Sequence, residues 1–544
     1  MASLVRSRLR ASLPASPALS RCIFAPVQRR SITIEGLDST KRGRERVLIL
    51  GSGWSGFTLA QRLDASKYQP VVVSPRSYFV FTPLLASTSV GTLEFRTALE
   101  PVRRKRRGKG SEVEYVQGWA DRVDFAQRTV EVEEAVEDPR IGLAMTGEGK
   151  RTEEEVKDEK RKGKVFKLEW DKLVVSVGCY VETFGTPGVR EHALFLKDVG
   201  DARKIRNRLL ACFEMAALPT TTDEMRKELL NFAIVGGGPT GIEFSAELHD
   251  IISEDLSRVY PELVPFTNIT VYDVAPQVLS MFDAELGKYA MKTFRREGIN
   301  IRTEHHVECL RRGPPSGSED VRNGDGVYTL KVKEVGEIGV GMVVWSTGLM
   351  MNPFVKRALT EVQPLPKEGV EVRNVEAKDT QDITWRVKKH PKIGSVITDE
   401  HMRVMLEGER KAKGAGEGEG GTSDEPPRAI LNDVFALGDC ASIEGTMYPA
   451  TAQVASQKAE WLAKRLNKGD IGQTAFHWRN MGVMAYLGNW NAILQGAGRG
   501  ISGRTAFLIW RGAYLTKSVS WRNKILIPTY WFINWVFGRD MSRF

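Results

Sequence analysis

Two glycine-rich loops carry the clearest chemical signal in this chain of 544 residues. Each follows a short apolar run and opens a helical stretch: Gly51-Ser-Gly53-Trp-Ser-Gly56 and Gly236-Gly-Gly238-Pro-Thr-Gly241. In this spacing the first glycine makes a turn, the second lets the backbone approach a pyrophosphate, and the third lets the helix pack on the strand. The helix N-terminus then presents N–H groups and a positive dipole end to the phosphates. Two such loops predict two dinucleotide sites.

The residue that ends the strand after each loop helps to assign the sites. The second unit ends in Asp273, where a carboxylate can accept hydrogen bonds from an adenosine ribose and repel a 2′-phosphate, which favours NADH over NADPH. An aspartate that only stabilises a turn is the alternative interpretation. The first unit ends in Ser74-Pro-Arg76 without an acid, so if this loop binds FAD, other groups must hold the ribose.

A third strand ends abruptly in Gly438-Asp439. In flavoproteins with two dinucleotide sites, such a strand returns to the first domain, and its aspartate reaches the ribityl or pyrophosphate region of the flavin. Gln453 and Gln457 follow at a spacing of four, so they share one face of a helix. Two amides there suit a flavin carbonyl edge or an incoming quinone; a surface face with two glutamines is the alternative.

These signals predict an α/β protein with two Rossmann-like dinucleotide-binding domains and a C-terminal amphipathic helical segment that anchors it to a membrane. Strands that end at Gly178 and Gly348 would close the two domains. Charged stretches at 138–165, 313–326 and 407–428 read as solvated loops. The predicted limits are 1–40 for a presequence, 44–205 and 429–475 for the FAD-binding domain, 206–370 for an inserted NADH-binding domain, 371–428 for a partly disordered insertion, and 476–544 for a membrane-anchoring and dimerisation region.

The net charge of +10 is concentrated at the two ends of the chain. Residues 1–34 hold six arginines and neither lysine nor acid, and they lack a long apolar run. This pattern is typical of a mitochondrial presequence, with a disordered basic tail as the alternative. Because the basic residues are not spread over the middle of the chain, we expect no nucleic-acid partner.

The C-terminal stretch 504–544 is crowded with aromatic and basic residues. Phe507, Trp510 and Tyr514 recur at helical spacing, and the apolar run 525–537 contains Pro528. A run of this length is too short to span a bilayer, which takes about 20 apolar residues. It suits a helix that lies in the membrane interface. A helix packed on the protein body or at a dimer interface is the alternative, and both can hold.

Together these motifs resemble the type II (alternative, rotenone-insensitive) NADH:ubiquinone oxidoreductases of the fungal mitochondrial kind. The resemblance rests on both loops, on the C-terminal segment, and on the stretches 74–85, 435–440 and 452–457, and it covers nearly everything from about residue 44 to 544. Ser346 departs from it, because an alanine is commoner there.

The resemblance implies a non-proton-pumping enzyme that passes a hydride from NADH to non-covalent FAD and two electrons on to ubiquinone. It implies that Gln453 and Gln457 line the quinone site beside the flavin and that Glu243 lies close to flavin and nicotinamide. FAD would be held by Gly51, Gly53, Gly56 and Asp439, and NADH by Gly236, Gly238, Gly241 and Asp273. The enzyme would be peripheral on the mitochondrial inner membrane through residues 504–544, as a homodimer.

Two other functions remain open on the sequence. Related disulfide reductases place a C-x-x-C pair beside the flavin, and none of the five cysteines here has that spacing. A sulfide:quinone oxidoreductase would need a cysteine pair, for which Cys179 and Cys440 are the candidates. A flavin-binding NADH redox sensor or signalling protein is the other alternative. No residues show metal-ligand spacing, so we expect no metal.

Overall fold

The computed structural model describes residues 33–103, 113–138, 141–146, 163–316, 326–375, 380, 383–410, 425–496 and 500–543. The predicted presequence lies outside these residues as far as residue 32. The chain divides into two compact units, 1–43 and 44–544. The first contains the short helix α1 (Ile34–Ser39), and all elements below belong to the second.

A parallel sheet positions the first glycine loop. Its central strand β1 (Glu45–Leu50) lies between β2 (Tyr68–Ser74) and β8 (Lys172–Val175). Five consecutive residues of β1 are buried, as expected for a strand covered on both faces. Because the strands are parallel, the loop that follows β1 lies at the carboxyl edge of the sheet, where helix α2 (Trp54–Arg62) begins.

The first sheet is widened on both sides. Beyond β2 come β5 (Glu114–Asp124) and an antiparallel extension, and beyond β8 comes β23 (Arg428–Ala436), parallel to β8. The stretch 371–428, which we expected to be a partly disordered insertion, contributes strands to this sheet, with residues 411–424 outside the description. These strands are β19 (Val370–Arg373), β20 (Ile383–Val387), β21 (Val396–Thr398) and β22 (Arg403–Arg410).

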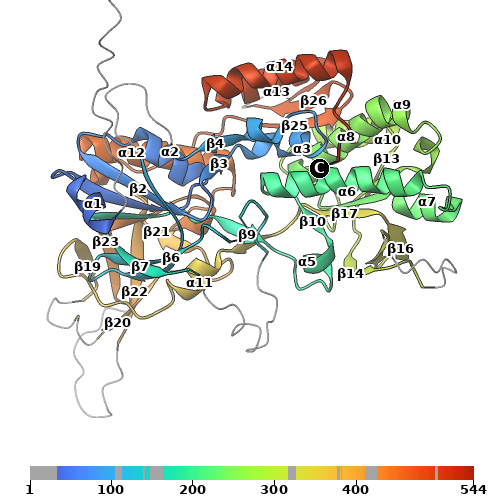
Figure 1. Ribbon diagram of the computed structural model, residues 1–544. Coiled ribbons are helices and arrows are strands. Elements are labelled where there is room, and N and C mark those ends of the chain that lie inside the picture. Colours follow the sequence, from blue (N-terminus) through green and yellow to red (C-terminus); the bar gives the residue numbers. More distant parts are fainter. Residues whose placement is uncertain are drawn as a thin grey trace, which may run out of the picture. The chain divides into compact units, whose positions relative to one another are not determined.

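A second parallel sheet positions the second glycine loop (Figure 1). Helix α6 (Val199–Ala216) packs on it and crosses the domain limit that we predicted at 205/206. Helix α8 (Pro239–Ile251) follows the second loop, as α2 follows the first. The strand order is β10 (Leu194–Phe195), β17 (Met342–Trp345), β11 (Asn231–Val235), β12 (Asn268–Tyr272) and β13 (Ile299–Arg302).

The two sheets are joined by a matching pair of short strands. β8 runs through Gly178 into β9 (Cys179–Val181), and β17 runs through Gly348 into β18 (Leu349–Met351). β9 and β18 pair in antiparallel fashion. The predicted strand-then-glycine ends are therefore the points where the chain leaves each sheet.

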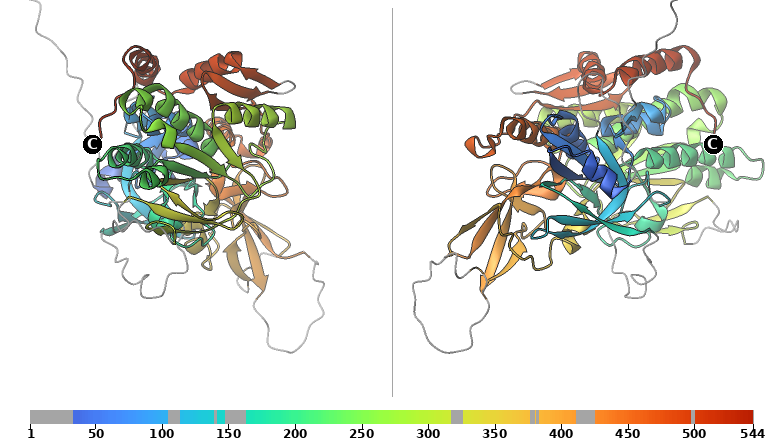
Figure 2. Two further views of the ribbon diagram at one scale, coloured as in Figure 1. Left: turned by 90° about the vertical axis from the view of Figure 1, so that its right-hand side faces the viewer. Right: turned by 60° about the vertical axis from the view of Figure 1, so that its left-hand side comes forward.

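The C-terminal part adds a small antiparallel sheet and two helices. The sheet consists of β25 (Val483–Gly488), β26 (Asn491–Gln495) and β27 (Gly500–Gly503). α13 (Arg504–Lys517) and α14 (Trp521–Phe537), which contains Pro528, lie next to each other (Figures 1 and 2). β25 packs against α8, so this part of the chain lies on the helix that the second glycine loop opens.

A buried ion pair holds the end of α14 in place. Arg539 lies 2.5 Å from Asp255 and 2.8 Å from Glu254, which belong to the π-helical turn η3 (Ile252–Leu256) at the end of α8. The side chains of Arg539 and Asp255 are about one-tenth exposed, at 9% and 10%. The pair therefore ties the last described turn of the chain to the second sheet's helix layer.

We expect Arg539→Leu to lower the free energy of unfolding by about 3 kcal/mol, because it leaves the buried carboxylate of Asp255 without its cationic partner. The matched control is Arg62→Leu, which breaks a pair with Glu460 whose side chains are 54% and 45% exposed. That change should cost less than about 1 kcal/mol. Urea unfolding followed by circular dichroism measures both, and equal losses would contradict the buried pair's role.

Candidate functional site

The first glycine of each loop has a backbone conformation that requires glycine. Gly51 has φ +112° and Gly236 has φ +115°. A Cβ atom on Gly51 would lie 2.3 Å from the carbonyl oxygen of Ser176, and one on Gly236 would lie 2.9 Å from Cβ of Thr347. In each sheet the turn is thus pressed against the neighbouring strand end.

In each loop the third glycine is closely packed, whereas the middle glycine faces open space. A Cβ on Gly56 would lie 2.0 Å from the oxygen of Gly51, and one on Gly241 would lie 2.0 Å from the oxygen of Gly236. At Gly53 and Gly238, no atom of the described residues lies within 4 Å of the added Cβ. The middle glycines therefore leave open space before the N-terminus of α2 and α8, and both loops fit a dinucleotide pyrophosphate.

Matching serines close the two loops. The hydroxyl of Ser176 donates to the oxygen of Leu50 at 2.9 Å, and that of Ser346 donates to the oxygens of Val235 and Gly236 at 3.1 and 3.2 Å. Ser346, the departure noted in the sequence, thus does in the second sheet what Ser176 does in the first. An alanine would leave the strand pairing intact but would remove this bond.

Asp273 lies at the second loop, as its place after β12 predicted. Its carboxylate accepts hydrogen bonds from the N–H of Gly237 and, at 2.7 Å, from the N–H of Ala275. These bonds are those of a turn aspartate, the alternative raised above. A carboxylate has about four acceptor positions, so Asp273 retains capacity for a ribose hydroxyl.

The first loop has a hydroxyl pair at the equivalent position. Ser52 Oγ lies 2.9 Å from Ser74 Oγ and donates to the oxygens of Arg76 and Tyr78 at 3.1 and 3.2 Å. Arg76 is engaged elsewhere, since its Nη1 lies 2.6 Å from the buried carboxylate of Asp198. Ser74 therefore takes the place that Asp273 has in the second loop, without a charge.

Asp439 lies in the short turn η6 (Gly438–Cys440) that follows β23, near the start of α2. Its neighbour Gly438 approaches Ser55 of α2 so closely that an added Cβ would lie 2.9 Å from the hydroxyl. Burial raises the pKa of Asp439, and the ammonium groups of Lys197 and Lys458 oppose that shift. The sequence thus predicted where Asp439 lies, but it did not identify the two lysines beside it.

The two lysines differ in how the sequence could have revealed them. Lys458 is 3% exposed, and its Nζ donates to the oxygen of Ala441 at 3.4 Å. It shares a helix face with Val454 and Leu462 at spacing four, so its burial in an apolar row could have been predicted from the sequence. Lys197 Nζ donates to the oxygen of Cys179 at 2.5 Å, and no sequence pattern marks it. Burial lowers the pKa of both lysines.

Gln453 and Gln457 lie on one face of α12 (Ala452–Lys468), as predicted, and both bind the segment 478–482. Gln453 accepts from the indole of Trp478 and the N–H of Met481, both at 3.1 Å, and donates to the oxygen of Gly482 at 3.2 Å. Gln457 accepts from the N–H of Arg479 at 3.0 Å and donates to its oxygen at 2.9 Å. An amide has two N–H donors, so each glutamine retains one.

Glu243 lies on α8, but its side chain is directed to the C-terminal part of the chain. Its Oε1 accepts from the backbone N–H of Tyr486 on β25 and from the indole of Trp510 on α13, both at 3.2 Å. The residue is 8% exposed, and burial raises its pKa to about 8. Burial thus favours the protonated form of Glu243, and its two partners were not predicted.

The two candidate cysteines do not form a reactive pair. Cys179 and Cys440 are both free. Burial raises the pKa of Cys179 to about 12 and that of Cys440 to about 11. Reactive cysteines usually have a lowered pKa, and both shifts here are in the opposite direction.

The C-terminal helices separate a buried row from an exposed apolar face. Phe507 and Trp510 are 3% and 4% exposed, so the aromatic row predicted on α13 packs mainly on the protein body, as in the alternative interpretation. Within the described stretches, no helix is both long and apolar enough to cross a membrane. We name as the apolar face the exposed residues Leu508, Ile509, Val519, Trp521, Ile525, Phe532, Ile533, Trp535, Val536 and Phe537.

Known proteins match this chain along most of its length. Residues 45–373 match the family described as pyridine nucleotide-disulphide oxidoreductase, and residues 480–540 match the NDH2 C-terminal domain. A probable NADH dehydrogenase of Dictyostelium discoideum is 35% identical, with 93% of each chain covered. An external alternative NAD(P)H-ubiquinone oxidoreductase B1, mitochondrial, of Solanum tuberosum is 33% identical, with 92% of this chain and 90% of that protein covered.

A solved structure shares the fold. NDH2 from Plasmodium falciparum in complex with NADH has a TM-score of 0.70 at 22% identity, covering 92% of this chain and all of that one. The two-sheet architecture and the C-terminal part therefore recur together in another protein.

The opposite surroundings of Gly238 and Gly241 give a paired prediction. We expect Gly241→Ala to destabilise the fold, because its Cβ would meet a backbone oxygen at 2.0 Å. Gly238→Ala should fold with an unchanged melting temperature but bind NADH at least tenfold more weakly, because its Cβ would fill the open space. Thermal melting and equilibrium NADH titration measure the two effects, and a Gly238→Ala variant that binds NADH normally would contradict this reading of the loop.

The raised pKa of Glu243 predicts a pH dependence of stability. In the unfolded chain this carboxyl ionises at the ordinary pKa of 4.5, and in the folded protein at about 8. Between these values the unfolded state has lost a proton that the folded state keeps, so the residue's contribution to stability falls as pH rises. Glu243→Gln keeps the acceptor oxygen but cannot ionise.

We therefore expect the melting temperature of Glu243→Gln, relative to the unchanged protein, to increase steadily from pH 5 to pH 8. Differential scanning calorimetry across that range measures it. A difference that stays constant with pH would mean that Glu243 ionises normally in the folded protein.

Proposed function

This chain belongs to the type II NADH dehydrogenase family of pyridine nucleotide-disulphide oxidoreductases, and from that membership we propose that it is a non-proton-pumping NADH:ubiquinone oxidoreductase that contains FAD. It oxidises NADH and reduces ubiquinone in the mitochondrion. The observation that carries the proposal is the pair of equivalent glycine loops, each of which suits a dinucleotide, on two sheets that β9 and β18 join.

Bound FAD supplies the redox chemistry, because a flavin accepts a hydride from NADH and gives up two electrons to a quinone. The residues proposed to hold it are Gly51, Gly53, Gly56 and Asp439. The first three form the open loop at the N-terminus of α2, which is suited to the pyrophosphate. Asp439 lies beside Lys197 and Lys458, so its carboxylate has nearby positive charge when it is ionised.

Gly236, Gly238, Gly241 and Asp273 are proposed to hold NADH. The open space at Gly238 and the N-terminus of α8 suit its pyrophosphate. The remaining acceptor capacity of Asp273 suits the ribose hydroxyls of the adenosine, and its charge would repel the 2′-phosphate of NADPH.

Gln453 and Gln457 are proposed to face the quinone with the N–H donor that each retains. Their other bonds hold the segment 478–482, so the amides are oriented before a substrate arrives. A quinone carbonyl accepts such a bond, and the bond strengthens as negative charge develops on the oxygen. Both glutamines thus position the segment as well as the substrate.

Glu243 is proposed to hold a proton close to the reacting rings. Oxidation of one NADH and formation of one quinol consume one proton from the medium. A carboxyl with a pKa of about 8 carries a proton at neutral pH on the oxygen that is free of the Tyr486 and Trp510 bonds. The same bonds fix this side chain between α8 and the C-terminal part.

We propose that the apolar face on α13 and α14 rests on the mitochondrial inner membrane. Ubiquinone is confined to lipid, so an enzyme that reduces it must meet the bilayer surface. Trp521, Trp535 and Phe537 are 77%, 72% and 80% exposed, and lysine and arginine residues on the same helices can face lipid headgroups. The same region is proposed to support a homodimer. The finer assignment to the fungal kind stays a prediction.

The test is turnover of purified, FAD-loaded protein with a soluble ubiquinone analogue, with NADH and NADPH compared. We expect rapid quinol formation with NADH and a much lower rate with NADPH. Gln457→Glu keeps an acceptor for the N–H of Arg479 but lacks both N–H donors, the one proposed for the quinone and the one bound to the oxygen of Arg479. It should therefore lower the quinone rate at least about tenfold.

Bleaching of the flavin by NADH should persist in Gln457→Glu, because that step does not involve the glutamine. The matched control is Gln127→Glu, at an exposed turn far along the chain from both loops. A flavin that NADH bleaches and quinone fails to reoxidise would replace the proposed activity with the redox-sensor function.

A further inference from the structure

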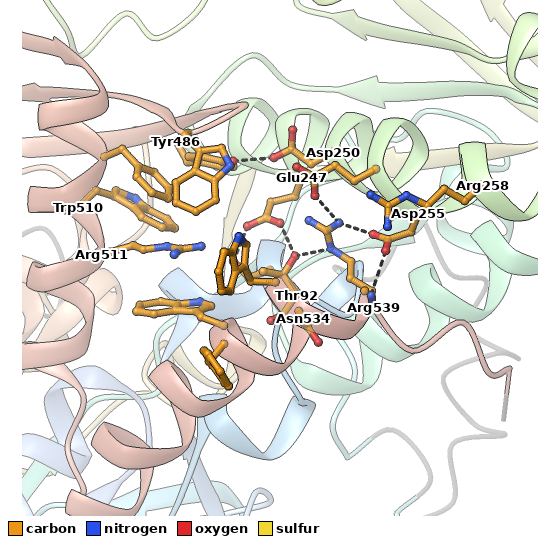
Figure 3. Close-up of a pocket in the computed structure, with 18 residues that line it drawn as sticks. Thr92, Glu247, Asp250, Asp255, Arg258, Tyr486, Trp510, Arg511, Asn534 and Arg539 are labelled. Carbon is orange, nitrogen blue, oxygen red and sulfur yellow. Dashed lines mark hydrogen bonds and ion pairs between the residues drawn. The ribbon is translucent and has the colours of Figure 1, made fainter.

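A cavity of about 540 Å³ lies where the end of α8 meets the C-terminal helices (Figure 3). One wall carries acidic residues of α8 and η3, among them Glu247, Asp250 and Asp255. The opposite wall carries aromatic rings of the β25–β26 turn, α13 and α14. None of the residues proposed above to hold FAD, NADH or quinone lines it.

Arg511 points into this cavity between aromatic rings (Figure 3). Its guanidinium carbon lies 4.4 Å from the ring centre of Trp531, 4.6 Å from that of Phe507 and 5.2 Å from that of Trp490. Stacked rings cover the faces of a guanidinium and leave its N–H groups at the edge.

The N–H groups of Arg511 lack acceptors among the described residues. Its Nε is buried without a hydrogen-bond partner, and burial lowers the pKa of the side chain. By contrast, Arg539 in the same cavity is paired with Asp255 and Glu254. A partly desolvated cation held in a fixed orientation is stabilised by an oxyanion that accepts two parallel N–H bonds, and phosphate has that geometry.

Because the cavity also has an acidic wall, we expect its ligand to carry a cationic group besides the phosphate. The cavity is lined by three arginines and four carboxylates, so its formal charge is not positive. Asp250 accepts from the hydroxyl of Tyr486 at 2.6 Å and from the N–H of Asn489 at 3.1 Å, and a carboxylate retains further acceptor positions. A ligand with both a phosphate and an ammonium group matches the two walls.

The mouth of the cavity is continuous with the apolar face. Phe532 and Trp535 line the cavity and are also 61% and 72% exposed. A ligand whose polar head lies inside would therefore direct any acyl chains along α14. This arrangement suits a lipid better than a free ion.

We propose that this cavity binds the headgroup of a zwitterionic membrane phospholipid, with its phosphate on Arg511 and its ammonium group toward Asp250. The acyl chains lie along Phe532 and Trp535 into the bilayer. The inference rests on the proposed membrane contact of α13 and α14, and it adds to that contact a specific site with a defined ligand.

Isothermal titration calorimetry of the FAD-loaded protein with dihexanoyl phosphatidylcholine, below its critical micelle concentration, tests the cavity without a bilayer. We expect saturable binding that Arg511→Gln weakens at least tenfold. Arg504→Gln removes the same charge from an exposed position on the same helix and should bind as the unchanged protein does. Trp490→Leu, at the partly exposed turn, is the second cavity variant and should also weaken binding. Flavin absorbance verifies that each variant is folded.

Further titrations distinguish the possible ligands. Inorganic phosphate that binds as tightly would show an anion site only, and tighter dihexanoyl phosphatidylglycerol would show preference for an anionic lipid. Displacement of the lipid by the ubiquinone analogue would assign the cavity to quinone. Each of these results, or unaltered binding by Arg511→Gln and Trp490→Leu, would overturn the proposal.

Vesicle flotation of Trp521→Ser tests the membrane contact separately, because Trp521 is exposed and does not line the cavity. Weaker flotation with normal binding of the short-chain lipid is the expected result. Normal flotation of this variant would contradict the membrane contact, and failure of the short-chain lipid to bind would reject the cavity proposal. Quinone turnover reports on the enzyme activity independently of both.

Discussion

The close approach of a helix to the strand before it sets the geometry on which both dinucleotide sites depend. At Gly56 and at Gly241 the helix backbone approaches the loop until an added Cβ would lie 2.0 Å from a carbonyl oxygen. This contact aims the N-terminus of α2 and α8 at the carboxyl edge of its sheet. The hydroxyls of Ser176 and Ser346 bind the same turns from the neighbouring strands. Both loops therefore have the same geometry, because each needs a glycine where its helix contacts the turn.

Much of this arrangement could be predicted from the sequence, because it depends on local spacing. The glycine loops, the aspartate in the turn after β23 and the shared helix face of Gln453 and Gln457 are all set by neighbours within a few residues. Contacts between distant segments could not be predicted in this way. The bonds of Glu243 to Tyr486 and Trp510 join positions more than 240 residues apart, and Lys197 reaches Asp439 only through the sheet arrangement.

Composition was a poor guide to the stretch 371–428 and to the aromatic row on α13. The first is charged overall, yet β19 to β22 extend the first sheet, because short apolar runs such as Val404-Met-Leu406 are buried between its charged residues. The aromatic row on α13 is compatible with either a membrane-facing or a core-facing side, because helical spacing shows that residues share a side but not what that side contacts. The burial of Phe507 and Trp510 and the packing of α13 on β25 and β26 show that this row is a core face.

The ladder between β9 and β18 has a mechanical consequence. It joins the two sheets through three residue pairs, and Trp345 adds a bond from its indole to the oxygen of Glu182 at 3.0 Å. Rotation of one sheet against the other would have to stretch this ladder, whose main-chain bonds act beside side-chain contacts such as that of Arg76 with Asp198. β9 also carries Cys179, whose thiol donates to the oxygen of Asp439 at 3.3 Å. The connection between the two sheets thus lies in direct contact with Asp439, a residue proposed to hold FAD.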